Sequence, residues 1–258
     1  MLQLTFWQNS YINILITEIK EIMQDIDLKN VMFIDIETVP MCASFDEMPE
    51  AFKKHWEKKS KNFRAETETA SDVYQRAGIY SEFGKIVCIS VGFVNGDKFR
   101  VKSFYGDDEK EILSGFADML VKWDPFGNKM LCGHNIKEFD VPYIARRMLV
   151  NRMYNLPKAL DLSGKKPWEI RHIDTLELWK FGDYKNFTSL ALMADLFDIP
   201  TPKDDIDGSE VAGVYYGEHD VERIAIYCEK DVLCVANLML RLQGKDIYMY
   251  DQMERANG

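Results

Sequence analysis

Acidic side chains at three separate places in the chain have the types and the spacing to bind divalent cations. Asp35 and Glu37 lie two residues apart in VMFIDIET, residues 31–38, which reads as a buried strand. Side chains two apart in a strand project from the same face, so these carboxylates lie side by side. Mg²⁺ prefers such oxygen ligands, and burying two charges without a partner is costly. The pair therefore favours a metal site over a salt bridge at a strand end.

The other two places are Asp140 and the pair Tyr227 and Asp231. Asp140 follows the predicted strand 130–134 within GHNIKEFD and enters a predicted helix. It either complements the helix dipole or lies beside Asp35, at the ends of neighbouring strands. Tyr227 and Asp231 are four residues apart, so they share one helix face. A core tyrosine next to a surface acid is the alternative interpretation of that pair.

The elements that must position these residues alternate between strands and helices. Strands are predicted over 31–38, 85–94, 97–104, 130–134 and 170–175, with a hairpin turn at Asn95-Gly96. Helices are predicted over 109–123, 138–151, 187–197 and 219–242. This order predicts an α/β fold with a mixed five-stranded sheet flanked by helices. Residues 40–84 form a long insertion, and residues 1–30 precede the first strand as a segment that can add a helix.

The composition excludes some classes of protein. The 258 residues carry a net charge of −10, which argues against a protein that coats nucleic acid but not against an enzyme that grips a few nucleotides. No apolar run reaches the roughly 18 residues of a membrane span, so no membrane contact is expected. The five cysteines lack C-x-x-C spacing, which favours free thiols in a reducing cytoplasm over a zinc site.

Three motifs, VMFIDIET, HNIKEFDVPYIARR and YCEKD, resemble in this order the exonuclease motifs of the DEDD superfamily. The likeness is to the bacterial stand-alone exonucleases related to the proofreading domain of B-family DNA polymerases, and HIDTLELW, TSLALMADLFDIP and IDGSEVAGVYY share it. It covers about residues 31–242 and implies a ribonuclease H-like 3′-5′ exonuclease domain. Residues 1–30 would then be an N-terminal extension and residues 243–258 a C-terminal tail. Tyr227, four residues before Asp231, matches the tyrosine branch (DEDDy), because no histidine stands at position 226.

The resemblance also implies a mechanism. The catalytic residues would be Asp35, Glu37, Asp140, Tyr227 and Asp231, and the four carboxylates would hold two divalent cations, Mg²⁺ or Mn²⁺. Such a pair of ions clamps the attacking and leaving oxygens of a phosphoryl displacement, which here would release nucleoside 5′-monophosphates. Tyr227 would orient the attacking water, because an ordinary tyrosine pKa of about 10 makes a poor base at neutral pH.

The resemblance further implies that Thr38, Val39, Asn135 and Phe139 hold the terminal nucleotide. Each also has an ordinary interpretation, as a strand-end, turn or core residue. The expected substrate is the 3′ end of single-stranded DNA, with RNA as the alternative. Two other hypotheses are a catalytically silent module that binds nucleic-acid ends and a proofreading subunit that works with a separate polymerase or repair partner.

Several basic residues allow two interpretations. The stretch 51–64 holds six Lys or Arg against one Glu. It either follows the phosphate backbone, with Trp56 and Phe63 as stacking surfaces, or forms a solvated helix face. Arg147 is either a phosphate contact or a solvated residue, and His134 is either a structural residue or a substrate contact.

Overall fold

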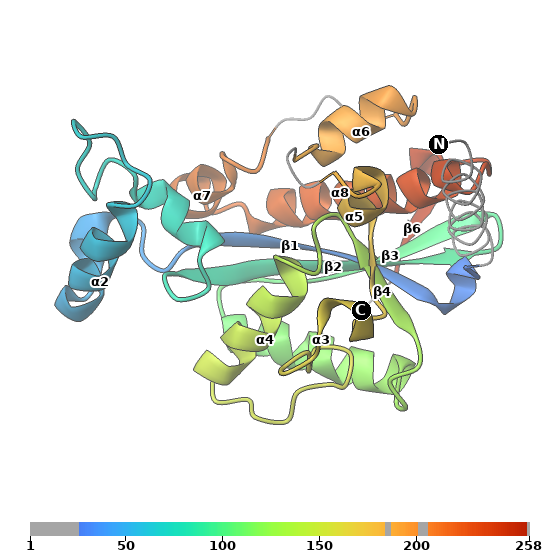
Figure 1. Cartoon of the computed structure of the whole chain (residues 1–258), viewed down its shortest axis with the longest axis horizontal. Helices are drawn as coiled ribbons and strands as arrows, with labels where there is room; N and C mark the ends of the chain where they lie inside the picture. Colours follow the sequence, from blue (N-terminus) through green and yellow to red (C-terminus); the bar gives the residue numbers. More distant parts are fainter. Residues whose placement is uncertain (1–25, 184–186, 201–205, 257–258) are drawn as a thin grey trace, which may run out of the picture.

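The structure, a computed structural model, describes residues 26–183, 187–200 and 206–256. Its centre is a mixed six-stranded sheet in the order β5-β4-β1-β2-β3-β6 (Figure 1). β2 runs antiparallel to both of its neighbours, and the other pairs are parallel. The α/β class and the ribonuclease H-like arrangement expected from the sequence are confirmed. The additional helix considered for residues 1–30 falls mostly on residues 1–25, which lie outside the described ranges.

The strands are β1 (Val31–Pro40), β2 (Gly84–Asn95), β3 (Lys98–Tyr105), β4 (Met130–Gly133), β5 (Ile173–Asp174) and β6 (Met253–Arg255). The helices are α2 (Glu50–Ser60), α3 (Glu109–Trp123), α4 (Asp140–Val150), α5 (Thr175–Lys180), α6 (Leu190–Leu196), α7 (Val211–Gly213) and α8 (Val221–Leu242). Shorter turns include the 3-10 helix η3 (Tyr74–Ile79) and the π-helix η5 (Val214–Glu218). No helix in the described ranges is both long enough and apolar enough to cross a membrane.

Local sequence explains several of these boundaries. The β2–β3 hairpin turns at Gly96, whose φ of 65° is readily adopted by glycine. α3 begins where the Asp108 side chain accepts hydrogen bonds from the backbone N–H groups of Lys110 and Glu111. α8 begins in the same way, with Asp220 accepting from the N–H of Arg223.

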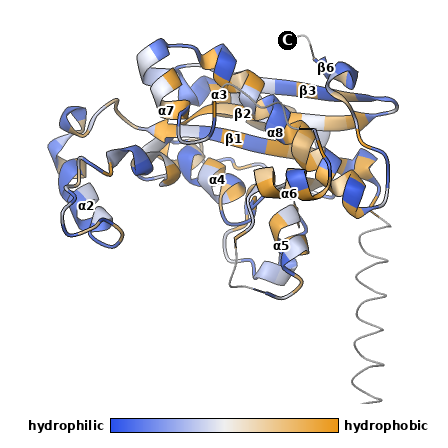
Figure 2. Ribbon diagram, turned by 90° about the horizontal axis from the view of Figure 1, so that it is seen from above, coloured by the Kyte–Doolittle hydropathy of each residue, from blue (hydrophilic) through white to orange (hydrophobic). Residues whose placement is uncertain are grey.

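Helices cover both faces of the sheet, with α3 and α4 on one side and α5, α6 and α8 on the other (Figure 1). Met32 and Ile34 of β1 pack in the core that includes α3 and α4, whereas Val31 and Phe33 pack against α8. Figure 2 shows the apolar segments concentrated in these central elements, while α2 at one end is mostly hydrophilic. Because side chains alternate along a strand, Asp35 and Glu37 project to the α8 face.

The prediction of five strands was wrong by one, because β6 joins the open edge of the sheet. Phe99, Arg100 and Val101 of β3 pair in parallel with Met253, Glu254 and Arg255. A strand of three residues has no periodicity that a sequence pattern can reveal, and the predicted C-terminal tail 243–258 contains it. The predicted strand over 170–175 is also shorter, and pairs with β4 only through Ile173 and Asp174.

Candidate active site

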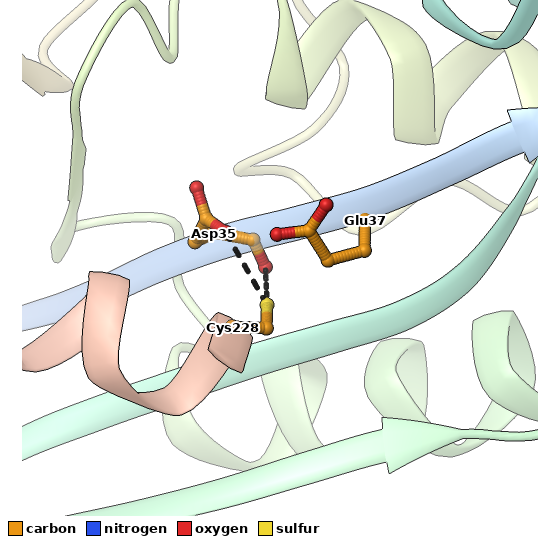
Figure 3. Close-up of side chains that lie close together, drawn as sticks. All are labelled: Asp35, Glu37 and Cys228. Carbon is orange, nitrogen blue, oxygen red and sulfur yellow. Dashed lines mark hydrogen bonds between the residues drawn. The ribbon is translucent and has the colours of Figure 1, made fainter. Parts of the chain in front are cut away.

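β1 holds Asp35 and Glu37 in the middle of the sheet, between β2 and β4. Asp35 pairs with Ser90 of β2 and Glu37 with Cys88, and the register shifts immediately after Glu37. Oxygen atoms of the two carboxylates and the Sγ of Cys228 all lie within 4.8 Å of one another. Figure 3 shows both carboxylates on β1, with Cys228 approaching from α8. This central strand fixes the two side chains in one place.

Asp140 reaches this place through the turn that joins β4 to α4. The carboxylate of Asp174 accepts hydrogen bonds from the backbone N–H groups of Asn135 (3.0 Å) and Lys137 (3.1 Å), which holds the turn in shape. Asp140 is the first residue of α4 and is only 3% exposed. It accepts a hydrogen bond from the backbone N–H of Ile36, the residue between the two β1 acids.

α8 supplies the remaining predicted residues. Tyr227 and Asp231 lie on one face of this helix, and the Tyr227 hydroxyl is hydrogen-bonded to the Asp231 side chain. The carboxylate of Asp231 is close enough to raise the pKa of both Asp35 and Glu37. Segments from the beginning, middle and end of the described chain therefore bring four carboxylates and one phenol together.

Three of these carboxylates are enclosed by the protein, with Glu37 and Asp140 buried and Asp35 partly buried. Burial, followed by the charges of Asp140 and Asp231, raises the pKa of Asp35 well above its usual value. Burial and the charge of Asp35 do the same for the pKa of Glu37. Burial raises the pKa of Asp140 to about 7. Within the described ranges, neither Asp35, Glu37 nor Asp140 forms an ion pair with a lysine, arginine or histidine.

The donor set fits divalent cations of the Mg²⁺ or Mn²⁺ type. Carboxylate oxygens are the ligands that these hard ions prefer, and a cation would relieve the repulsion among the acids. A bound cation would also restore the ionised form of side chains whose pKa is raised in its absence. The residues that offer oxygen ligands are Asp35, Glu37, Asp140 and Asp231.

The environment of Tyr227 makes its hydroxyl a hydrogen-bond donor. Burial raises the pKa of this phenol far above its usual value, and the charges of Asp231, Glu37 and Asp35 add to the effect. The hydroxyl therefore keeps its proton at neutral pH. Without a bound cation, a phenol in this state can orient a water molecule as a hydrogen-bond donor and is a poor base.

The four residues expected to hold a nucleotide have different surroundings. Thr38 is half-buried, and its side chain is hydrogen-bonded to Tyr143. The side chain of Val39 is fully buried, so only its backbone can meet a ligand. Asn135 has a left-handed φ of 66°, and Phe139 packs against Tyr143 with ring centroids 5.4 Å apart.

Two residues at the site were not among those predicted from the sequence. The Cys228 thiol donates to Asp35 Oδ2 at 3.3 Å. Its place on the site follows from helix spacing, three residues before Asp231, and would have been found by asking which neighbour of Tyr227 faces β1. Asp174 organises the turn before Asp140 and also caps α5, a helix that was not predicted from the sequence, where its side chain accepts hydrogen bonds from the N–H groups of Leu176 and Glu177.

His134 has a structural role, because both ring nitrogens are used. Nδ1 lies 2.9 Å from Thr175 Oγ1, and Nε2 lies 2.8 Å from the carbonyl oxygen of Thr188. A cavity of about 350 Å³ opens beside the catalytic face of α8. Its lining includes Tyr227, Asp231, Lys230, Ser189 and Leu190.

Comparisons with known proteins identify the family of the chain. Residues 79–254 match the model of a protein family described as predicted 3′-5′ exonucleases related to the exonuclease domain of PolB. The match includes Asp140, Tyr227 and Asp231 but begins after Asp35 and Glu37. The chain is similar to the DNA polymerase delta catalytic subunit of Oryza sativa subsp. japonica, with 23% identity over 176 residues. That alignment covers 58% of this chain and only 15% of the polymerase subunit.

A solved structure with some likeness is the RNase domain of the yeast Pop2 protein. Its sequence identity to this chain is 13%, and the TM-score is 0.39. The superposition covers 93% of this chain and 87% of the Pop2 domain.

Proposed function

The chain belongs to the family of predicted 3′-5′ exonucleases related to the exonuclease domain of PolB, and from that premise we propose that it hydrolyses the 3′ ends of single-stranded DNA with two divalent cations. The products are nucleoside 5′-monophosphates. The observation that carries the proposal is the cluster of buried carboxylates on β1, α4 and α8, which lacks protein cations around its β1 and α4 members. Two cations in such a site stabilise the attacking and leaving oxygens of a phosphoryl displacement.

Each residue of the site has a distinct task in this proposal. Asp35, Glu37, Asp140 and Asp231 hold the cations. Tyr227 keeps its proton and donates a hydrogen bond, which positions the attacking water. The backbone around Thr38 and the side chains of Asn135 and Phe139 orient the terminal nucleotide.

DNA is the proposed substrate because the polymerase subunit that resembles this chain is a DNA polymerase. RNA is the alternative, since discrimination between the two depends on a contact to the 2′-hydroxyl. The test is digestion of 5′-labelled single-stranded and double-stranded DNA and RNA of one sequence, with Mg²⁺, with Mn²⁺ and with EDTA. The proposal expects stepwise shortening from the 3′ end, fastest on single-stranded DNA and absent in EDTA.

Three results would change the proposal. Faster digestion of RNA would make the protein an exoribonuclease. Binding of ends without release of nucleotides, with either metal, would make it a silent binding module. Cleavage that begins at the 5′ end or inside the strand would refute the direction of the reaction.

A further inference from the structure

We propose that a basic pocket on α2, in the insertion between β1 and β2, binds the single-stranded part of the substrate upstream of the 3′ end. This inference rests on the proposed exonuclease function and adds a second contact site to it. The insertion lies beyond the carboxyl end of β1, apart from the helices that cover the sheet (Figures 1 and 2). Residues 40–78 of the insertion precede the region that matches the family, whereas two residues of the pocket, Glu82 and Phe83, lie within that region.

The pocket has a volume of about 500 Å³. It is lined by Phe52, His55, Lys58, Lys59, Asn62, Glu82 and Phe83. Phe52, His55 and Lys59 follow one another at spacings of three and four residues, so they lie on one face of α2. The pocket therefore combines aromatic and basic side chains, which is the combination that holds single-stranded nucleic acid.

The opposite face of α2 forms the core of the insertion, which corrects one expectation from the sequence. Trp56 is fully buried and donates its indole N–H to the carbonyl oxygen of Ala70 at 2.9 Å. Phe63 is stacked on Tyr80, with ring centroids 6.0 Å apart. Neither ring is available for the stacking role considered above. Phe52, which is 38% exposed, takes that role in the pocket.

Of the three α2 lysines that form no ion pair within the described ranges, Lys58 and Lys59 line the pocket and Lys54 does not. Lys53 and Arg64 are paired with Glu50 and Glu57. In the part of the chain that the structure describes, Lys58 and Lys59 form no ion pair, and the Lys59 ammonium lies 4.5 Å from the ring centroid of Tyr80. The pocket contains one acid, Glu82. In a chain with a net charge of −10, such a local excess of unpaired cations fits an anionic ligand.

The insertion is firmly connected to the active site. The N–H of Met41 donates to the carbonyl oxygen of Phe83 at 2.8 Å, directly beyond β1. The Tyr143 hydroxyl of α4 donates to the carbonyl oxygen of Gly78 at 2.7 Å. Met41 lies four residues after Glu37, which is roughly 13 Å of extended chain. A stacked strand advances about 3.4 Å per nucleotide, so about four nucleotides span the distance from Glu37 to Met41, and the pocket residue Phe83 lies next to Met41.

The first experiment compares hydrolysis of a dinucleotide with that of a single strand of about twelve nucleotides. The variant is Lys58→Glu with Lys59→Glu, and the matched control is Lys110→Glu with Lys122→Glu on α3, where both lysines are exposed on the far face of the sheet. We expect the ratio of kcat/KM for the long strand to that for the dinucleotide to fall about tenfold in the variant only. Phe52→Ala should lower the ratio about fivefold, because one stacked base is lost.

The second experiment measures binding directly, by fluorescence anisotropy of the same labelled strand in EDTA at several salt concentrations. Loss of two phosphate contacts should reduce the slope of log Kd against log salt by about 1.4. A circular dichroism spectrum and thermal unfolding curve like those of the wild type would show that the variant is folded.

The two experiments separate failure of the pocket from failure of the exonuclease proposal. An unchanged length ratio, or an unchanged affinity and salt slope in the folded variant, would overturn the pocket. Absence of hydrolysis on every substrate would refute the exonuclease, while the binding experiment would still test the pocket. A competition experiment gives one more test. If polyglutamate of equal length displaced the labelled strand at the same concentration as unlabelled DNA, the proposed pocket would be overturned, since it would then select charge alone.

Discussion

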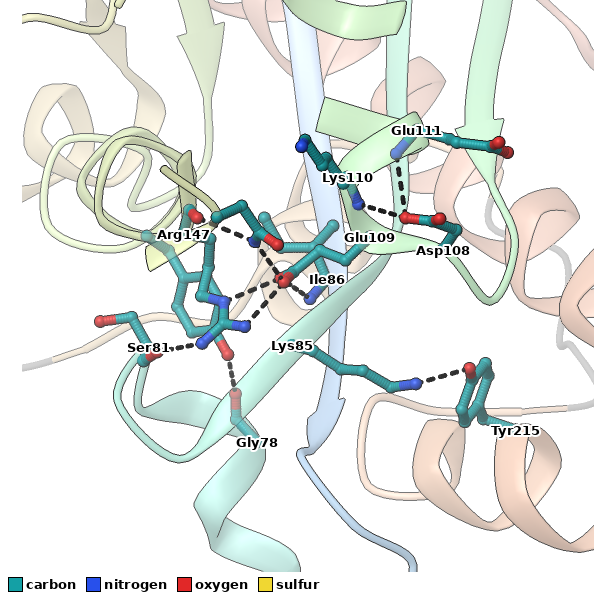
Figure 4. A network of polar contacts seen from close by, with 12 residues as sticks. Gly78, Ser81, Lys85, Ile86, Asp108, Glu109, Lys110, Glu111, Arg147 and Tyr215 are labelled. Carbon is teal, nitrogen blue, oxygen red and sulfur yellow. Dashed lines mark hydrogen bonds and ion pairs between the residues drawn. The ribbon is translucent and has the colours of Figure 1, made fainter. Parts of the chain in front are cut away.

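Two groups of buried carboxylates in this protein have opposite surroundings. Glu109, at the start of α3, is 8% exposed and accepts hydrogen bonds from Arg147 Nε (2.8 Å) and Nη2 (2.7 Å). The N–H of Ile86 donates to it as well, at 2.8 Å (Figure 4). The side chain of Asn151 is a further donor, at 2.7 Å. In the active-site cluster, by contrast, Asp35 receives a thiol hydrogen bond from Cys228 and lies beside other acids.

The difference indicates that Glu109 has a structural role, whereas the carboxylates of the active-site cluster are those proposed to bind cations. Each oxygen of Glu109 is satisfied by the protein itself, and its partner Arg147 also donates to the carbonyl oxygen of Ser81 at 2.9 Å. Arg147 thus links α3, α4 and the insertion inside the protein. The interpretation of Arg147 as a phosphate contact was wrong. Asp35 and Glu37, by contrast, have no charged partner among the described residues, and in the proposed function their oxygen atoms bind cations, at the expense of stability when none is bound.

The largest expected effect comes from removing one carboxylate of the site. Asp35→Ala should lower cleavage about a thousandfold or more, because a cation ligand is lost from a site whose residues act as a unit. The metal-free variant should be folded and no less stable than the wild type, because repulsion is relieved. Digestion of a labelled strand and thermal unfolding in EDTA measure the two effects. Exposed Asp118→Ala is the control, and an unfolded Asp35→Ala protein would contradict the distinction.

Breaking the ion pair between Arg147 and Glu109 should have the opposite result, a loss of stability with little change in cleavage. Arg147→Met leaves Glu109 buried without its cation, which should lower the free energy of unfolding by about 3–5 kcal/mol. Urea unfolding measures this loss. Cleavage per folded molecule should stay near the wild-type value, because Arg147 lies on the far side of the sheet from the catalytic acids. If Arg147→Met had a normal unfolding midpoint but had lost cleavage, the pair of Arg147 and Glu109 would be part of the catalytic machinery rather than a structural contact.

Loss of the Tyr227 hydroxyl should lower turnover without changing the affinity of the site for cations. Tyr227→Phe removes the hydroxyl that positions water, and kcat should fall about a hundredfold. The Mn²⁺ concentration that gives half-maximal activity should change little, because the carboxylates remain. Titration of activity with Mn²⁺ separates the two quantities. A large shift in that concentration would mean that the hydroxyl acts through the cation ligands instead.

The stability of the metal-free protein should depend on pH in an unusual direction. The pKa of Asp140 is about 7 in the folded protein and about 3.9 in an unfolded chain. Between these values the folded state binds more protons, so stability is highest near pH 4 and falls as pH rises toward 7. Asp140→Asn should flatten this slope, by about 3 kcal/mol between pH 4 and pH 7.

The effect of added cations on thermal stability tests the same electrostatic argument. Mg²⁺ or Mn²⁺ at pH 7 should raise the melting temperature of the wild type, because a ligand that binds the folded state stabilises it. At pH 5 the gain should be smaller, since protonated acids bind cations poorly. A stability that rises from pH 4 to pH 7 in EDTA would refute the burial of uncompensated charge.

The smallest effect is expected at Cys228. Cys228→Val removes the donor to Asp35 while keeping a similar volume, and kcat should fall about fivefold through misorientation of that carboxylate. Cys228→Ser restores a donor and should recover most of the activity. Equal activity of both variants would show that the thiol fills space without orienting Asp35.

Local patterns were enough to predict most elements and the composition of the site. α3 extends over the predicted residues 109–123, and β2 and β3 differ from their predicted ranges by one residue at each end. The same-face placement of Asp35 and Glu37 follows from the period of two in a strand, and that of Tyr227 and Asp231 from the spacing of a helix turn. These predictions work because neighbouring residues alone determine the periodicity.

Only the tertiary structure decided which distant segments meet. It brought α8 and Asp140 next to Asp35 of β1, added β6 to the edge of the sheet, and turned Arg147 inward onto Glu109. It also buried Trp56 and left the pocket beside Lys58 and Lys59 open. The physical reason is that pairing across tens of residues depends on how whole faces of helices and strands pack, and an acid or arginine has the same local pattern whether its partner is another side chain, a cation or water.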